Sequence, residues 1–262
     1  MDLQLEGKRA LVTGSTAGIG FASARALAAE AASVIINGRG QERVDAAISE
    51  IRKSHPRANV SGVASDVSSA AGCAKLIQAV AGVNILVNNM GIFEPKPFEK
   101  IPDEDWLHMF EANVMSGVRL SRHYLAGMRE KNWGRILFVS SESAVQIPAE
   151  MIYYGMTKTA QVAVARGIAE TVAGTGITVN SVLAGPTRSE GVETFIAQMG
   201  GGADSRGFEA EFFRSVRPTS LLKRFETTDE VASMIAYLCS PLASATNGAA
   251  IRVEGGVVRA IL

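Results

Sequence analysis

Two residues of the chain, a tyrosine and a lysine, have the types and spacing needed for proton transfer. Tyr154 and Lys158 are four positions apart, so both project from one face of a helix. A free tyrosine has a pKa of about 10, and a nearby ammonium group favours its phenolate. Ser141, thirteen residues before Tyr154, offers a hydroxyl that can hold the same substrate oxygen. Together they predict acid–base chemistry at a carbonyl or alcohol oxygen, with Lys158 lowering the pKa of Tyr154.

Tyr153 is a rival proton donor. The residue four positions after it is Thr157, which carries no charge. Tyr154 is therefore the preferred donor.

A glycine-rich turn near the start of the chain predicts a nucleotide phosphate site. An apolar run ends at Thr13 and is followed by Gly14-Ser15-Thr16-Ala17-Gly18-Ile19-Gly20 and then by a helical pattern. The first glycine permits a tight turn, the second lets the backbone approach a pyrophosphate, and the third allows close packing of helix on strand. The helix start adds free N–H groups and the positive end of a dipole.

The residues after the second predicted strand bear on which nucleotide binds. An NAD site needs an acid there for the ribose hydroxyls, whereas an NADP site needs a cation for the 2′-phosphate. The chain has Asn37-Gly38-Arg39 and no acid, so Arg39 can fork onto a phosphate and Arg43 can assist. NADP(H) is thus favoured over NAD(H) as the cofactor.

Short apolar runs alternate with helical patterns along the whole chain. The apolar runs predict buried strands at Arg9–Thr13, Val34–Asn37, Asn59–Ala64, Ile85–Asn88, Arg135–Ser140, Thr178–Leu183 and Ala249–Val253. The main helices are predicted at Ile19–Ala31, Glu42–Arg52, Asp103–Glu130, Tyr153–Ala173 and Asp229–Cys239. This alternation predicts an α/β fold, a Rossmann-type doubly wound parallel sheet with helices on both faces, and one domain over residues 1–262.

One region breaks the alternation. Residues 186–217 lack a clear pattern and contain Gly200-Gly201-Gly202. Ligands of open α/β sheets bind at the carboxyl ends of the strands, so this region is predicted to be a substrate lid. Four residues are expected to ring the mouth of a partly apolar cleft: Phe93, Gln146, Met151 and Phe195.

Composition excludes several classes of protein. The 26 basic and 26 acidic residues balance, so nothing points to nucleic acid or an anionic membrane as a partner. No apolar stretch approaches the roughly 20 residues that span a bilayer, and no signal peptide is recognisable, which indicates a cytoplasmic protein. The two cysteines, Cys73 and Cys239, and the three histidines lack metal-ligand spacing, so no metal is expected.

These motifs resemble the short-chain dehydrogenase/reductase family, in particular its 3-oxoacyl-ACP reductase-like members. The family's TGxxxGxG turn matches Thr13–Gly20, its YxxxK motif matches Tyr154–Lys158, and its active-site serine matches Ser141. The resemblance covers essentially the whole chain. It implies a seven-stranded sheet, a small-molecule carbonyl or alcohol substrate, and a homo-oligomer, either a dimer or a tetramer built on the two long helices.

The resemblance also implies further site residues. Asn113 matches the family's fourth catalytic residue, which positions a water that links the lysine to solvent. The other positions that match cofactor-binding elements of the family are Asp66 and Val67, Asn88 and Gly91 in Asn88-Asn89-Met90-Gly91, and Thr187 and Ser189 after Gly185. In the family, Tyr154 and Lys158 would contact the cofactor too.

Four positions depart from the family pattern. Met90 replaces a small alanine, Ala184 replaces a proline, and Glu254 stands where an aspartate is usual. Ala31 replaces a glycine at the end of the first helix, so a left-handed backbone there would carry a strain cost. None of these changes removes a catalytic atom.

The sequence therefore predicts an NADP(H)-dependent oxidoreductase that interconverts a ketone and a secondary alcohol. Two alternatives stay open. One is another reaction on the same scaffold, such as sugar-nucleotide epimerisation or dehydration, although such relatives usually have a longer C-terminal substrate domain. The other is a non-catalytic nucleotide-binding scaffold or redox sensor.

Overall fold

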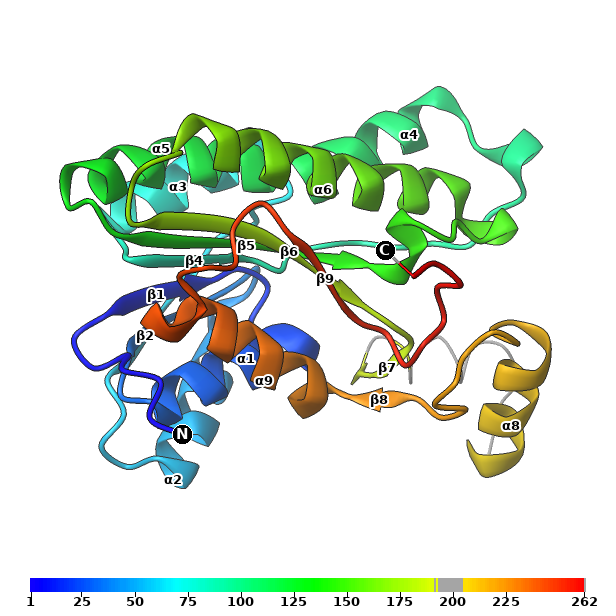
Figure 1. Ribbon diagram of the computed structural model, residues 1–262, viewed down its shortest axis with the longest axis horizontal. Helices are drawn as coiled ribbons and strands as arrows, with labels where there is room; N and C mark the ends of the chain where they lie inside the picture. The colour runs from blue at the N-terminus through cyan, green and yellow to red at the C-terminus, as the bar shows by residue number, and fades with distance from the viewer. Residues whose placement is uncertain (191, 193–204, 262) are drawn as a thin grey trace.

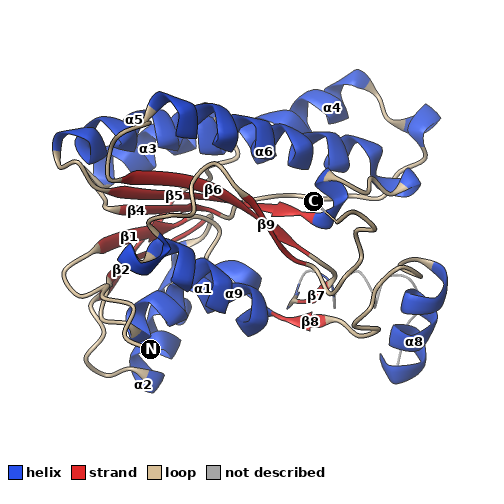
Figure 2. Cartoon of the chain, viewed as in Figure 1, coloured by secondary structure: helices blue, strands red, loops and turns tan. Residues whose placement is uncertain are grey.

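The computed structural model describes residues 1–190, 192 and 205–261. Its main feature is one parallel sheet of seven strands. Figures 1 and 2 show this sheet between layers of helices. The strands are β1 (Arg9–Val12), β2 (Ser33–Gly38), β3 (Val60–Ala64), β4 (Ile85–Asn88), β5 (Gly134–Ser141), β6 (Ile177–Ala184) and β9 (Ala250–Val253). They lie in the order β3-β2-β1-β4-β5-β6-β9, which confirms the predicted doubly wound sheet.

Helices cover both faces of this sheet. One face carries α1 (Gly18–Ala29), α2 (Gln41–Ser54) and α9 (Thr228–Cys239), and the other carries α3 (Ala70–Ala79), α5 (Ser116–Glu130) and α6 (Ile152–Thr171) (Figure 1). The chain therefore forms three layers, with the sheet buried between two layers of helices. The strand order reverses between β1 and β4, and ligands of open α/β sheets bind at the carboxyl ends of the strands at such a switch point.

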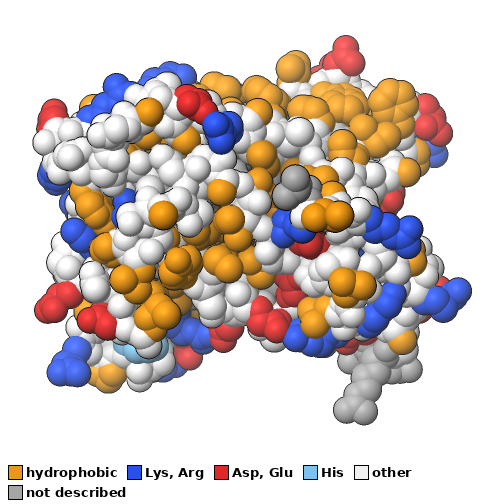
Figure 3. All heavy atoms as spheres, viewed as in Figure 1, with side chains coloured by type: hydrophobic (Ala, Val, Ile, Leu, Met, Phe, Trp, Pro, Cys, Tyr) orange, Lys and Arg blue, Asp and Glu red, His pale blue; other side chains and the backbone are white. Residues whose placement is uncertain are grey.

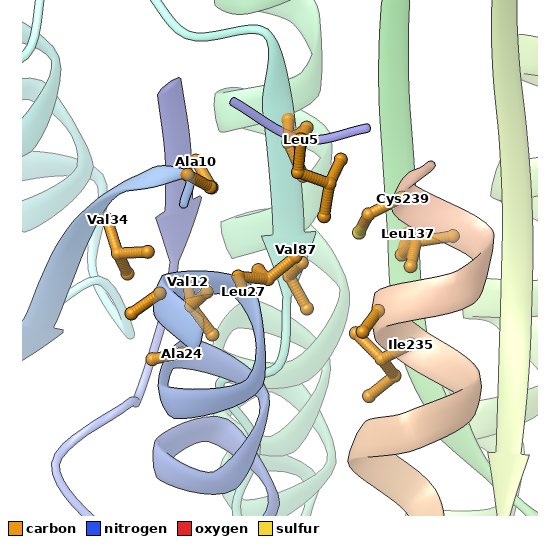
Figure 4. Packing of buried hydrophobic residues seen from close by; sticks show 14 of the residues in the cluster. Leu5, Ala10, Val12, Ala24, Leu27, Val34, Val87, Leu137, Ile235 and Cys239 are labelled. Atoms are coloured by element: carbon orange, nitrogen blue, oxygen red, sulfur yellow. The ribbon is translucent and has the colours of Figure 1, made fainter. Parts of the chain in front are cut away.

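The core lies between the sheet and its helices because the strands are apolar on both faces. On one face, Leu27 of α1 and Ile235 of α9 pack against Val12, Val87 and Leu137 of the strands (Figure 4). On the other face, a second cluster joins residues of β1, β4, β5 and β6 to α3, α5 and α6. Such two-sided burial is typical of parallel sheets and fixes the strand ends that carry the site.

The predicted helix at Asp103–Glu130 is interrupted. It consists of α4 (Asp103–Phe110), a π-helical turn (Glu111–Met115) and α5. A π turn inserts an extra residue into the helix and is often found at functional sites. Asn113 lies within this turn.

The region predicted to be loose contains regular structure. Strand β7 (Thr187–Arg188) pairs with β8 (Glu226–Thr227), and α8 (Ser205–Ser215) lies beyond the carboxyl end of β6 (Figure 1). The expectation of an irregular segment is wrong for these residues because their aromatic side chains pack together, with the Phe212 and Phe225 ring centroids 5.0 Å apart. Phe195 and Gly200-Gly201-Gly202 lie outside the described residues, so the lid stays a prediction.

Charged side chains of both signs are interspersed on the face drawn in Figure 3. Both cysteines are buried and free. Across the described ranges, no helix is long and apolar enough to cross a membrane. The same ranges hold no group of three or more His, Cys, Asp or Glu side chains that could bind a metal.

Candidate active site

The turn after β1 has a tight backbone path that requires its glycines, and we call this turn the cradle. Gly14 and Gly18 have positive φ angles of 60° and 59°. A Cβ atom at Gly20 would lie 2.4 Å from Asn89 Nδ2 and 2.5 Å from the carbonyl oxygen of Gly14, so only glycine fits there. Helix α1 begins directly after Ala17, which provides no side-chain cap for the first N–H groups. These N–H groups and the helix dipole fit a phosphate group.

Asn89 braces this cradle from the end of β4. Its Nδ2 donates to the carbonyl oxygens of Thr13 at 2.9 Å and Gly14 at 3.0 Å, and its backbone N–H donates to Thr13 Oγ1 at 3.0 Å. The sequence analysis singled out the neighbouring Asn88 instead. The Asn88 side chain is buried and donates to Ser121 Oγ on α5 at 3.2 Å. Its side chain therefore faces α5, and Asn89 is the residue that the sequence reasoning missed.

Ser15 and Thr16 have different surroundings. Ser15 is fully buried, its hydroxyl donates to Val12 O at 2.6 Å, and its N–H donates to Asn37 O at 2.8 Å. Its polar groups thus hold the turn against β2. Thr16 lies against the end of β2, since a Cβ atom at Gly38 would meet its methyl group at 2.5 Å. Ile19 is partly buried at the start of α1.

The two arginines expected near the 2′ position are placed differently. Arg39 follows β2 directly, is exposed, and has no hydrogen-bond or ion-pair partner in the part of the chain that the structure describes. Arg43 on α2 forms an ion pair with Glu190 at 2.7 Å. Arg39 is therefore the cation of the two that remains free for a ligand.

The remaining cofactor residues lie at the carboxyl ends of β3, β4 and β6. Asp66 is exposed and its Oδ1 accepts from the Ser68 hydroxyl at 2.7 Å, and Val67 beside it is buried. Thr187 donates to Gly185 O at 2.9 Å. Ser189 faces the cradle, since a Cβ atom at Gly18 would lie 3.5 Å from its Cβ. The structure thus brings residues from distant parts of the chain to one edge of the sheet.

The predicted proton-transfer residues meet where β5 packs on α6. Ser141 ends β5, and Tyr154 and Lys158 lie on the first turns of α6. Lys158 Nζ lies 5.4 Å from the Tyr154 ring centroid and donates to Val139 O at 2.9 Å. Ser140 Oγ donates to the Lys158 carbonyl oxygen at 2.9 Å and ties the strand to the helix.

Burial and nearby charges set the electrostatics of this group. Burial raises the pKa of Tyr154, the negative charge of Glu142 raises it further, and the hydrogen bond between Tyr154 and Ser141 and the charge of Arg217 offset only part of the rise. Burial also lowers the pKa of Lys158 to about 8. Among the chain's own side chains, burial and Glu142 therefore dominate the pKa of Tyr154, and the expected lowering by Lys158 stays a prediction. The Tyr154 hydroxyl therefore keeps its proton at neutral pH.

Tyr153 is directed elsewhere. It is buried beside Trp106, with ring centroids 5.8 Å apart, and its hydroxyl donates to Glu94 at 3.5 Å. Burial, followed by the charge of Glu94, raises its pKa. The preference for Tyr154 over Tyr153 agrees with this geometry.

Asn113 lies close to Lys158 and is held by backbone and side-chain contacts. Its Oδ1 accepts from the Ile92 N–H at 2.7 Å, and its Nδ2 donates to Thr157 Oγ1 at 3.0 Å. Its carbonyl oxygen accepts from Gln161 Nε2 at 2.6 Å, and Gln161 Oε1 accepts from Lys158 Nζ at 3.3 Å. Gln161, which the sequence reasoning missed, thus links the two residues directly.

Gly91, in the loop after β4, lies next to Lys158 and Asn113. A Cβ atom there would lie 3.4 Å from Lys158 Nζ and 3.5 Å from Asn113 Oδ1. Glycine therefore leaves room between the loop after β4 and the reacting group.

Of the described residues expected at the mouth of the cleft, Phe93 has a ring contact with Tyr154. The Phe93 ring lies edge-on to Tyr154, with centroids 6.2 Å apart. Gln146 donates to Thr219 Oγ1 at 3.1 Å, and Met151 lies in a 3₁₀ turn before α6. Glu142 and Arg217 lie beside Ser141 and were not predicted, because they are 75 residues apart and form no local motif.

Comparison with known proteins decides the family. A sequence model described as enoyl-(acyl carrier protein) reductase matches residues 14–258. The chain belongs to the short-chain dehydrogenase/reductase family. Within this family, it is 48% identical to the uncharacterized oxidoreductase YvaG of Bacillus subtilis over the whole of both chains. It is 34% identical to D-beta-hydroxybutyrate dehydrogenase of Cupriavidus necator, over 97% of this chain and 99% of that protein.

Solved structures of short-chain dehydrogenase/reductases agree with this assignment. L-sorbose reductase from Gluconobacter frateurii, solved with NADPH and L-sorbose, superposes with a TM-score of 0.94 at 30% identity over the whole of both chains. The chain is accordingly an NAD(P)-dependent oxidoreductase that acts on CH–OH groups, with a carbonyl or alcohol as its substrate. The alternative of a non-catalytic scaffold is therefore set aside.

Proposed function

We propose that this enzyme reduces a ketone to a secondary alcohol with NADPH, and can run the reverse reaction with NADP⁺. One observation carries the proposal. The glycine cradle after β1 and the group formed by Ser141 at the end of β5 and Tyr154 and Lys158 on α6 lie at the same carboxyl edge of one parallel sheet, with β4 between β1 and β5. Substrate and nucleotide can therefore meet at the same edge.

The cradle fits the nucleotide because the positive φ angles at Gly14 and Gly18 and the close packing at Gly20 form a tight turn that leads directly into the start of α1. The N–H groups that begin α1 would hold the pyrophosphate, and Arg39 would hold the 2′-phosphate. Asp66, Val67, Thr187 and Ser189 are proposed to line the rest of the nucleotide site. When bound, the nicotinamide supplies or accepts the hydride at the carbonyl carbon.

The side chains of the chain handle the oxygen and its proton. Ser141 donates a hydrogen bond to the carbonyl oxygen, and Tyr154 gives that oxygen its hydroxyl proton. Lys158 stands beside Tyr154, and its positive charge stabilises the phenolate that remains. Asn113 and Gln161 fix the Lys158 ammonium in place. Because the pKa of Tyr154 is raised, Tyr154 carries the proton that the reductive direction consumes.

The NADP(H) preference rests on Arg39. We expect isothermal titration of the wild-type protein to give a lower Kd for NADPH than for NADH. Arg39→Ala should raise the Kd for NADPH about 10- to 100-fold, because a hydrogen bond to a charged group is lost, and leave the Kd for NADH unchanged.

Arg43→Ala is the matched control because Arg43 is paired with Glu190. It should leave the ratio of the two Kd values as in the wild type. Equal Kd values for NADPH and NADH in the wild type would contradict the proposed cofactor preference. The structure of the related L-sorbose reductase, which was solved with NADPH, supports the proposed preference for NADPH.

The assembly and location of the enzyme are also part of the proposal. The resemblance to the family suggests a homo-oligomer, a dimer or tetramer, that uses the long helices α5 and α6. A cytoplasmic location agrees with the balanced charge of the sequence.

A further inference from the structure

Glu142 is a buried carboxylate next to the proposed reaction centre. It directly follows Ser141 and begins a short 3₁₀ turn, and its side chain is 5% exposed. A carboxylate in such a place must be paired, because burying an unpaired charge is costly. Its partners therefore define what the residue does.

Both carboxylate oxygens have partners. Oε1 accepts from Arg217 Nε at 3.0 Å, and the Arg217 side chain is itself only 11% exposed. Oε2 accepts from the Ser143 N–H at 3.0 Å and from the Ser141 hydroxyl. The Ser141 oxygen also accepts from the Ser143 N–H at 3.1 Å. The proposed catalytic serine thus gives its only hydroxyl proton to Glu142.

This arrangement has a consequence during reaction. A serine hydroxyl has one proton to donate, so Ser141 must turn it away from Glu142 to hold a substrate carbonyl oxygen. Oε2 then loses a hydrogen bond while it stays buried, which is unfavourable. A substrate that brings its own donor beside the carbonyl restores the lost bond.

We propose that Glu142 is a specificity-determining residue that selects ketones with a hydroxyl group on the carbon next to the carbonyl. The proposal rests on the proposed function, because it takes Ser141 as the residue that holds the carbonyl oxygen. The substrate hydroxyl donates to Glu142 Oε2 as the Ser141 hydroxyl moves to the substrate. Arg217 holds Oε1, so the carboxylate stays oriented. The same negative charge disfavours 2-oxo acids, whose carboxylate would take the place of the hydroxyl.

The wild-type enzyme provides the first test. We would measure kcat/KM with NADPH for 3-hydroxybutan-2-one, 3-methoxybutan-2-one and butan-2-one. The hydroxy ketone should exceed the other two by about 10- to 100-fold, as expected for one hydrogen bond to a charged acceptor. The methyl ether controls for the electronic effect of the oxygen substituent, because it lacks a donor. Equal values for the hydroxy ketone and its ether would overturn the proposal.

The variant Glu142→Gln provides the second test. Its amide must point the oxygen at Arg217 and its NH₂ at Ser141, so it cannot accept from the substrate hydroxyl. The ratio of kcat/KM for the hydroxy ketone to that for the ether should fall at least about tenfold. Glu150→Gln is the matched control, because Glu150 also pairs with Arg217, at 3.5 Å, but is half-exposed and has no contact with Ser141.

The outcomes separate this proposal from the function on which it rests. An unchanged ratio in Glu142→Gln, with both rates lowered alike, would overturn the proposal and leave the proposed function standing. Turnover of none of the three ketones by the wild type, with NADPH bound, would contradict the proposed function and this inference with it.

Discussion

Glu226 is a carboxyl group that the fold keeps away from water and from partners. It is 3% exposed, and neither carboxyl oxygen has a hydrogen-bond partner among the residues the structure describes. Burial raises its pKa from 4.5 to about 8, and the negative charges of Glu230, Glu254 and Glu142 add to the rise. The nearby Gly185 N–H, which donates to Val253 O at 2.9 Å, offsets part of it.

This raised pKa makes the stability of the protein depend on pH. Below pH 4.5, Glu226 is protonated in both the folded and the unfolded chain. Between pH 4.5 and about 8, the folded chain keeps the proton and the unfolded chain loses it, so the free energy of unfolding falls as pH rises. Glu226→Gln removes this loss. At pH 8, the variant should exceed the wild type in free energy of unfolding by on the order of 2–4 kcal/mol, measured by urea denaturation.

Glu230 on the neighbouring helix is the control with the opposite sign. The hydrogen bond from Arg224 lowers its pKa to about 2, so Glu230→Gln should lower the free energy of unfolding at pH 8. Because the side chain is 42% exposed, the loss should be about 1 kcal/mol or less. If the gap between Glu226→Gln and the wild type were the same at pH 5 and pH 8, the buried-carboxyl explanation would be wrong.

Residues with a short motif were predictable, and residues that meet through the fold were not. The spacing of Tyr154 and Lys158 identified them because one helical turn separates them. Glu142 and Arg217 come from distant parts of the chain, so no window of sequence shows their pair. Asn89 was missed since two adjacent asparagines have equal claims until the direction of each side chain is known.

At the scale of elements, the end of α1 carries a measurable strain. Ala31, two residues beyond the helix, has a positive φ of 61°, so the left-handed backbone considered in the sequence analysis is present. An L-residue with a Cβ atom adopts this conformation at a cost that glycine avoids.

Ala31→Gly should therefore stabilise the protein. The relief of strain exceeds the extra backbone entropy of glycine in the unfolded chain, for a net gain of about 0.5–1 kcal/mol. Thermal unfolding of the variant measures this gain as a higher Tm. Ala29→Gly, at the exposed last residue of α1, should lower the Tm instead. A lower Tm for Ala31→Gly as well would contradict the strain argument.

Element types were easier to predict than their interruptions. Apolar runs identified all seven strands of the main sheet because both of its faces are buried. The π turn at Glu111–Met115 was missed, since one extra residue in a helix barely alters its apolar period. Helix α8 was missed because its aromatic residues are stabilised by contacts with Phe225, outside the segment.

At the scale of the whole molecule, the parallel sheet is what assembles the site. The cradle follows β1 and the reacting group follows β5, with β4 between the two strands. Since all seven strands are parallel, their carboxyl ends share one edge, and residues more than a hundred positions apart meet there. This much followed from the sequence, because strand–helix alternation allows few other topologies.

The choice of substrate could not follow in the same way. In our proposal it depends on side chains from the 3₁₀ turn after β5 and from the segment after α8, whose contacts form only in the folded chain. Sequence patterns predict the fold, whereas substrate specificity depends on the individual side chains at the site.

The central claim is that Tyr154 transfers the proton at the carbonyl oxygen. The direct measurement is the rate of NADPH oxidation by a reactive ketone for the wild type and Tyr154→Phe, with NADPH affinity measured in parallel by calorimetry. Tyr153→Phe is the matched control, because its hydroxyl is directed at Glu94. We predict that Tyr154→Phe binds NADPH like the wild type and loses at least about 10²–10⁴-fold in kcat, while Tyr153→Phe keeps most of it. Comparable kcat values for Tyr154→Phe and the wild type would contradict the account.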